Sequence, residues 1–93
     1  SIRYDVVVLD LIATGLLQTG EKLEMRYKPR NGDARTYVGE VQSSGDIEVL
    51  GKSFQSPSYA ALYGMQDAGS TRHTVNGWTS WRNADGKLGT KLR

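Results

Sequence analysis

The sequence predicts an α+β domain in which a small antiparallel sheet, a meander plus a C-terminal strand or hairpin, packs with two helices. Three observations predict this class: helical spacing of apolar residues near the start, alternation of apolar and charged residues over residues 22–54, and a serine–proline pair that opens a second helical segment. The 93 residues suffice for one domain and are too few for two. Residues 1–93 are therefore interpreted as a single domain, which we expect to be part of a longer protein.

The first helix is expected over residues 6–14. The β-branched residues at its start would by themselves favour a strand. However, Asp5 can cap a helix, Gly15 can end one in the left-handed conformation, and the apolar residues between them recur at three- and four-residue spacing. The two leucines of the connector over residues 16–20 are expected to pack back on this helix.

The middle of the chain predicts a meander of short strands. Leu23, Met25 and Tyr27 alternate with charged residues, which is typical of a half-buried strand. Turn sequences containing Asn-Gly and Ser-Gly follow, at residues 29–33 and 43–46. The expected strands cover residues 22–28, 36–41 and, in two short pieces, 47–54.

A second helix is expected to begin after Ser56. Its hydroxyl can accept hydrogen bonds from the free N–H groups of the first turn, and Pro57 fits the first helical position. Ser56 is therefore interpreted as a helix cap rather than a ligand. The helix should end at about Met65 or Gln66, and a loop over residues 67–74 should follow.

The segment with both tryptophans is expected to be a strand over residues 77–82. Successive side chains of a strand point to opposite faces, so Trp78 and Trp81 would lie on opposite sides, one buried and one displayed for stacking on a base. Two core tryptophans are the alternative. A turn at residues 85–86 and a short basic edge strand over residues 87–93 should complete the sheet.

Charge is unevenly distributed along the chain. The formal net charge is +2, but residues 72–93 carry five basic and one acidic side chain, and residues 22–35 carry five basic and two acidic. Two basic patches on a nearly neutral chain favour contact with a polyanion. A solvated surface is the alternative.

Residue types that would support catalysis are scarce. His73 is the single histidine and there is no cysteine, so neither a Cys–His pair nor a thiolate metal site can form. No glycines have the spacing of phosphate-binding loops. We therefore predict an accessory domain with no catalytic residue, no metal and no cofactor. A soluble protein without membrane contact is expected, because no apolar run reaches the length of a membrane span and no leader pattern is present.

Nucleic acid is the leading ligand, because lysines and arginines can contact phosphates while planar or paired-donor groups can contact bases. The residues expected near bases are Arg72, Asn76, Trp78, Trp81 and Arg82. Those expected at phosphates are Lys28, Arg30, Arg35, Lys52, Lys87, Lys91 and Arg93. The alternative is a module that docks a protein partner, or another domain of the same polypeptide, through an exposed aromatic patch.

Four stretches of the chain carry a family resemblance: residues 11–23, 45–47, 51–61 and the Asn-Gly-Trp-Thr-Ser-Trp stretch at residues 76–81. In this order they resemble the RAMA domain, the module associated with restriction enzymes and adenine methylases. The segment 29–34, rich in turn residues, departs from the family pattern like an insertion. The methyltransferase motifs are absent, so any catalysis would lie elsewhere in the parent protein.

The resemblance implies binding of double-stranded DNA, which could be methylated. Such domains occur at the C-terminus of bacterial adenine-N6 methyltransferases, beside nucleases of modification-dependent restriction, and in MPN-domain proteins of animals. Reading of N6-methyladenine has been proposed for the animal proteins. The resemblance therefore implies a cytoplasmic place at the bacterial nucleoid, or a nuclear one in a eukaryote.

Overall fold

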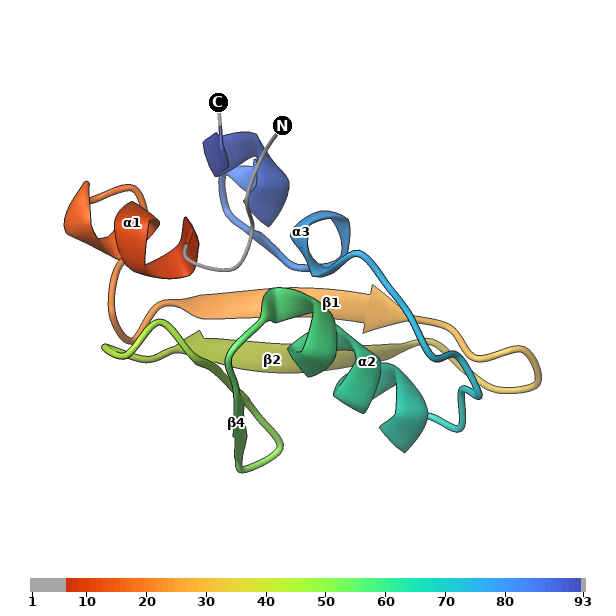
Figure 1. Cartoon of the computed structure of the whole chain (residues 1–93). Coiled ribbons are helices and arrows are strands. Elements are labelled where there is room, and N and C mark those ends of the chain that lie inside the picture. The colour runs from red at the N-terminus through yellow and green to blue at the C-terminus, as the bar shows by residue number, and fades with distance from the viewer. Residues whose placement is uncertain (1–6, 93) are drawn as a thin grey trace.

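The computed structural model describes residues 7–92, which form one antiparallel sheet with helices packed on one of its faces (Figure 1). The strand order is β4-β3-β2-β1-β5-β6. This α+β architecture confirms the predicted class. In chain order the elements are α1 (Val7–Ala13), β1 (Lys22–Tyr27), β2 (Arg35–Val41), β3 (Ile47–Val49), β4 (Lys52–Phe54), α2 (Pro57–Asp67), α3 (Gly77–Ser80), β5 (Arg82–Asn83), β6 (Gly86–Lys87) and the 3-10 helix η1 (Leu88–Leu92).

Strands β1 and β2 form the centre of the sheet and confirm the predicted alternation. Leu23 pairs with Gly39 and Met25 with Tyr37, and all four are buried on the helix-covered face. The residues between them point to the opposite face, which is exposed. Because side chains alternate along a strand, this pairing fixes which charged residues share the exposed face.

Strands β3 and β4 form the short hairpin expected at the end of the meander. The turn consists of Leu50 and Gly51, whose φ angles of 52° and 81° are both positive. Such angles are typical of a type I′ turn, whose twist matches that of the flanking strands. Phe54, at the end of β4, packs on Tyr63 of α2 with the ring centroids 5.1 Å apart.

Helix α1 covers residues 7–13 of the expected 6–14, and Gly15 ends it with φ of 79°. Asp5 and residue 6, on which the predicted cap depends, lie outside the described residues. Only one of the two following leucines packs as expected. Leu17 is buried, whereas Leu16 is half exposed.

Helix α2 confirms the predicted start and extends one residue beyond the expected end. The Ser56 hydroxyl accepts hydrogen bonds from the N–H groups of Ser58 and Tyr59, at 3.1 and 3.3 Å. Buried Ala60, Ala61 and Gly64 let the helix approach the sheet closely (Figure 1). Within residues 7–92, no helix combines the length and apolar character needed to cross a bilayer.

The prediction of a strand over residues 77–82 is wrong for most of that segment. Residues 77–80 form α3, and only Arg82–Asn83 form strand β5. Asn76 begins the helix, because its Oδ1 accepts the N–H of Trp78 at 3.0 Å. The hydroxyls of Thr79 and Ser80 donate back to the Asn76 carbonyl. These local bonds compete successfully with extension of the strand.

The predicted edge strand over residues 87–93 is also mostly wrong. Gly86–Lys87 pair with β5 as strand β6, but η1 follows immediately. Leu88 is buried, and Gly89 lies so close to α3 that a Cβ there would be 3.0 Å from the Trp78 carbonyl oxygen. Burial of Leu88 therefore turns the chain over α3 and away from the sheet edge.

Candidate nucleic-acid interface

The junction of α2 and α3 buries both tryptophans. The Trp81 indole donates from Nε1 to the Pro57 carbonyl at 2.9 Å, and the N–H of Gly77 donates to the Ser58 hydroxyl at 3.0 Å. Trp78 is 3% exposed and Trp81 is 0% exposed. The prediction that one indole is displayed is therefore wrong. A short helix places residues three apart on one side, so both rings enter the core.

Asn76 is exposed at the start of α3, at the edge of this junction. Its carboxamide oxygen is occupied by the N–H of Trp78. Its Nδ2 has no hydrogen-bond partner among the described residues, so two N–H donors face solvent. The structure therefore leaves Asn76 two free N–H donors for a ligand, beside an oxygen that already accepts one hydrogen bond.

Four cations lie on the two segments that come together where α2 ends, and we call them the hairpin-end cluster. Its members are Lys28, Arg30, Arg35 and Arg72. Asp67 of α2 accepts a hydrogen bond from Tyr37 at 3.0 Å and lies 3.9 Å from the guanidinium of Arg35. The neighbouring Gln66 donates to the carbonyl of Arg72 at 3.3 Å. The end of α2 thus holds both the β1–β2 hairpin and the loop over residues 68–76, and Figure 1 shows the two at one end of the molecule.

The hairpin-end cluster is open to solvent and only partly neutralised. All four cations are exposed. Among residues 7–92, no carboxylate forms an ion pair with Lys28, Arg30 or Arg72. Asp33 lies in the same hairpin, and His73 follows Arg72 in the loop. Excess positive charge on flexible, solvated side chains is the arrangement that suits phosphate contacts.

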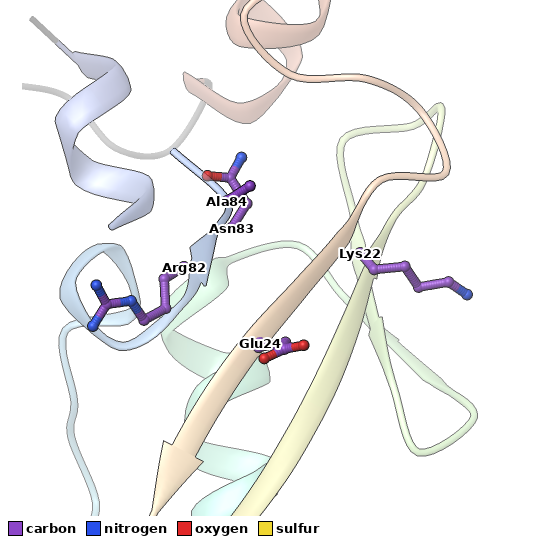
Figure 2. A pocket seen from close by; sticks show the side chains of 5 residues that line it. All are labelled: Lys22, Glu24, Arg82, Asn83 and Ala84. Carbon is purple, nitrogen blue, oxygen red and sulfur yellow. The ribbon is translucent and has the colours of Figure 1, made fainter. Parts of the chain in front are cut away.

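Arg82 and Lys87 lie on the uncovered face of the sheet, apart from that cluster. Arg82 pairs with Lys87 on one side and with Glu24 on the other. A shallow cavity of about 330 Å³ lies here, lined by Lys22, Glu24, Arg82, Asn83 and Ala84. Figure 2 shows the side chains of Lys22 and Arg82 pointing in opposite directions from it. They therefore do not converge on one anion.

Carboxylates share this sheet face with the cations. Lys22 donates to Glu40 at 3.0 Å, and this hydrogen bond, with the charge of Lys22, lowers the pKa of Glu40. Glu24 and Glu48 are exposed on the same face. The uncovered face is thus of mixed charge, which fits a polyanion less well than the hairpin end does.

The remaining predicted cations are dispersed. The ammonium of Lys52 lies 5.5 Å above the ring of Tyr63, beside β4. Lys91 is 3.5 Å from Asp85, and its side chain is only 11% exposed. Arg93 lies outside the described residues. The structure therefore divides the predicted contact residues among separate surfaces.

Two ring-bearing side chains that were not among the predicted contacts line a slot. Tyr59 of α2 and His73 of the following loop border a cavity of about 280 Å³. Helical periodicity could have revealed Tyr59, because the buried residues of α2 recur from Pro57 at three- and four-residue spacing and Tyr59 falls outside that series. Among the described residues, no group of three histidine or carboxylate side chains could hold a metal.

The whole chain can be compared with known protein families and with curated proteins. No curated protein matches it. Residues 2–93 match the family model described as RAMA, Restriction Enzyme Adenine Methylase Associated. That name links the domain to the adenine methylases of restriction–modification, as an associated module. Because the match extends over essentially the entire sequence, this protein belongs to the RAMA family.

Proposed function

We propose that this chain is a non-catalytic module that binds double-stranded DNA through the hairpin-end cluster. The observation that carries the proposal is that the hairpin with Lys28 and Arg30 and the loop with Arg72 lie at one end of the molecule (Figure 1), and that these three exposed cations form no ion pair with any described carboxylate. Three free cations in one place supply affinity for a phosphate backbone without specifying sequence.

The biological setting follows from the family name, which points to enzymes that methylate or cut DNA. The catalytic step belongs to other domains of the parent protein, and this module adds affinity for the target. It would act at the bacterial nucleoid or, in a eukaryote, in the nucleus. The sharper form of the proposal is that the module distinguishes N6-methyladenine from adenine.

The uncovered sheet face supports a second candidate function, docking of another domain of the parent protein. Val38 of β2 is 49% exposed on this face, and the charged residues around it on β1 and β2 carry both signs. An apolar side chain within mixed charges is typical of a polar domain interface. Such docking would weaken little with salt, whereas DNA binding would weaken steeply.

A salt titration tests DNA binding and its location. Wild type should bind a fluorescent duplex with an affinity that falls linearly with salt on logarithmic axes. The double variant Arg30→Gln/Arg72→Gln should lower that slope by about 2, because each phosphate contact contributes about 0.9. The matched variant Arg82→Gln/Lys87→Gln removes the same charge from the sheet face and should leave the slope unchanged.

Two results would contradict the proposal. Absence of any duplex binding at low salt removes DNA as the ligand. If only Arg82→Gln/Lys87→Gln reduces the slope, the phosphate contacts lie on the uncovered sheet face and not at the hairpin end. Duplexes of one sequence with both, one or no strands methylated test the sharper form, and equal affinity for all three leaves general DNA binding.

A further inference from the structure

We propose that the slot between α2 and the loop over residues 73–75 holds one unstacked nucleobase against the ring of Tyr59. This inference rests on the proposed DNA binding and names the part of the DNA that the module contacts besides phosphate. Ser58, Tyr59 and Leu62 of α2 line one side, and His73, Thr74 and Val75 of the loop line the other.

Among the aromatic side chains of residues 7–92, Tyr59 is the best placed to stack on a base. It is 66% exposed, while both tryptophans and Tyr37 are buried, Tyr27 is half-buried against the core, and Phe54 and Tyr63 pack on each other. Its backbone N–H is bound by the Ser56 cap, so the ring stands on the fixed first turn of an 11-residue helix. A rigidly held ring provides a stacking surface at little entropic cost.

The slot has the size and chemistry for one base. Its volume of about 280 Å³ is at the lower limit of pockets that enclose drug-sized ligands, about 300–1,000 Å³. Leu62 and Val75 are half-buried and provide apolar walls for the faces of a ring. The hydroxyls of Ser58 and Thr74, together with His73, offer hydrogen-bonding groups for its edge. An aromatic cage for a methylated lysine would need several rings around the cation, and only Tyr59 and His73 are available here.

The slot is continuous with the hairpin-end cluster. His73 lines the slot, and Arg72 immediately before it belongs to the cluster. The loop that carries both is held by the bond from Gln66 to the Arg72 carbonyl. A nucleotide whose phosphate contacts Arg72 therefore has its base within reach of the slot. Unpaired or mismatched bases should enter most readily, because less stacking energy is lost on their extrusion.

The test compares a matched duplex with the same duplex carrying one unpaired adenine. Wild type should bind the bulged duplex about 5- to 150-fold more tightly, the range that stacking of one base on an aromatic ring provides. Tyr59→Ala should reduce this ratio to near 1 with the salt slope unchanged. Tyr59→Phe should retain it, because the ring is kept. Leu16→Ala, at an exposed leucine outside the slot, is the matched control and should behave like wild type.

The outcomes separate this inference from the proposed function. If the matched duplex is bound with the expected salt dependence but the bulge gives no preference, the slot is wrong and DNA binding stands. A preference that survives Tyr59→Ala, or is lost in Tyr59→Phe, also overturns the slot. If neither duplex is bound, both proposals fail together. Circular dichroism confirms that each variant is folded.

Discussion

Replacing Gly77 with alanine should destabilise the fold strongly. The loss should exceed that at any other glycine whose φ is not positive, where alanine can adopt the native backbone conformation. A Cβ at Gly77 would lie 2.2 Å from the carbonyl carbon of Pro57, and 2.3 Å from its oxygen and from the nitrogen of Ser58. All three are backbone atoms, so rotation of a side chain cannot relieve the clash. The α2–α3 junction must open instead.

The loss of unfolding free energy in Gly77→Ala can be estimated from the contacts that are broken when the α2–α3 junction opens. Overpacking costs about 1–3 kcal/mol. Loss of the bond from Gly77 to the Ser58 hydroxyl costs about 0.5–1.5 kcal/mol, and leaving the Trp81 indole N–H unpaired in the core costs about 1–3 kcal/mol. Together these make about 2.5–7.5 kcal/mol, against a total stability of about 5–14 kcal/mol for a chain of this length. The helical gain of alanine over glycine, about 1 kcal/mol, is too small to compensate.

Urea denaturation measures this loss, followed by far-UV circular dichroism and by tryptophan fluorescence, since both indoles flank the junction. Gly64→Ala is the matched control, because Gly64 is also helical and buried. Its Cβ would meet the terminal methyl of Met25 at 2.9 Å, which can move, so its loss should be much smaller. A Gly77→Ala variant as stable as wild type, or more stable, would refute the steric account and leave only helix propensity.

Three further changes test other parts of the structure. Trp81→Phe should lower the free energy of unfolding by about 1–3 kcal/mol, because the indole hydrogen bond to the Pro57 carbonyl is lost and the smaller ring leaves a cavity. The folded variant should keep its DNA affinity, and a folded variant with lost affinity would show that the indole contacts DNA. Ser56→Ala should lower the free energy of unfolding, measured by urea denaturation, by about 0.5–2 kcal/mol. An unchanged free energy would mean that water hydrogen-bonds to the N–H groups of Ser58 and Tyr59 equally well. Lys22→Met should reduce stability at neutral pH but not below the lowered pKa of Glu40. A carboxyl group whose pKa is lowered in the folded state stabilises the fold above its unfolded pKa. That contribution is lost as the pH falls through the folded pKa. A loss of stability in acid equal to that at neutral pH would therefore contradict the pairing of Lys22 with Glu40.

The sheet and α2 could be predicted because their signals are local and repeated. Alternation over six residues of β1 fixes one buried face, and a slip of one residue would expose Leu23 and Met25 together. The cap at Ser56 and the proline after it act within one turn. Each signal is sufficient without knowledge of distant parts of the chain.

The tryptophan segment could not be predicted in this way because four residues are too few to show a period. Its conformation is decided by a tertiary contact, the approach of Gly77 to the backbone of Pro57, which no local pattern encodes. One local signal was available. Asn76 is a strong N-cap residue, and its position just before Gly-Trp-Thr-Ser favours a helix over a strand.

The grouping of charges also depended on tertiary structure. The sequence placed Arg72 with Arg82 and Lys87, and Lys28 with Lys22, because they are neighbours along the chain. The fold exchanges these partners. Strand alternation sends Lys22, Arg82 and Lys87 to the uncovered face, whereas the hairpin and loop bring Arg30 and Arg72 to the end of α2. Counts of charge along a sequence segment therefore cannot identify a surface.

Helix α2 connects stability with the proposed binding. Its first turn holds α3 through Pro57 and Ser58, and carries Tyr59 into the slot. Its last turn holds the hairpin through Asp67 and the loop through Gln66. The slot and the hairpin-end cluster are thus both fixed to one rigid element. A change that loosens α2 should weaken phosphate contact and base preference together, whereas a change on the uncovered sheet face should affect neither.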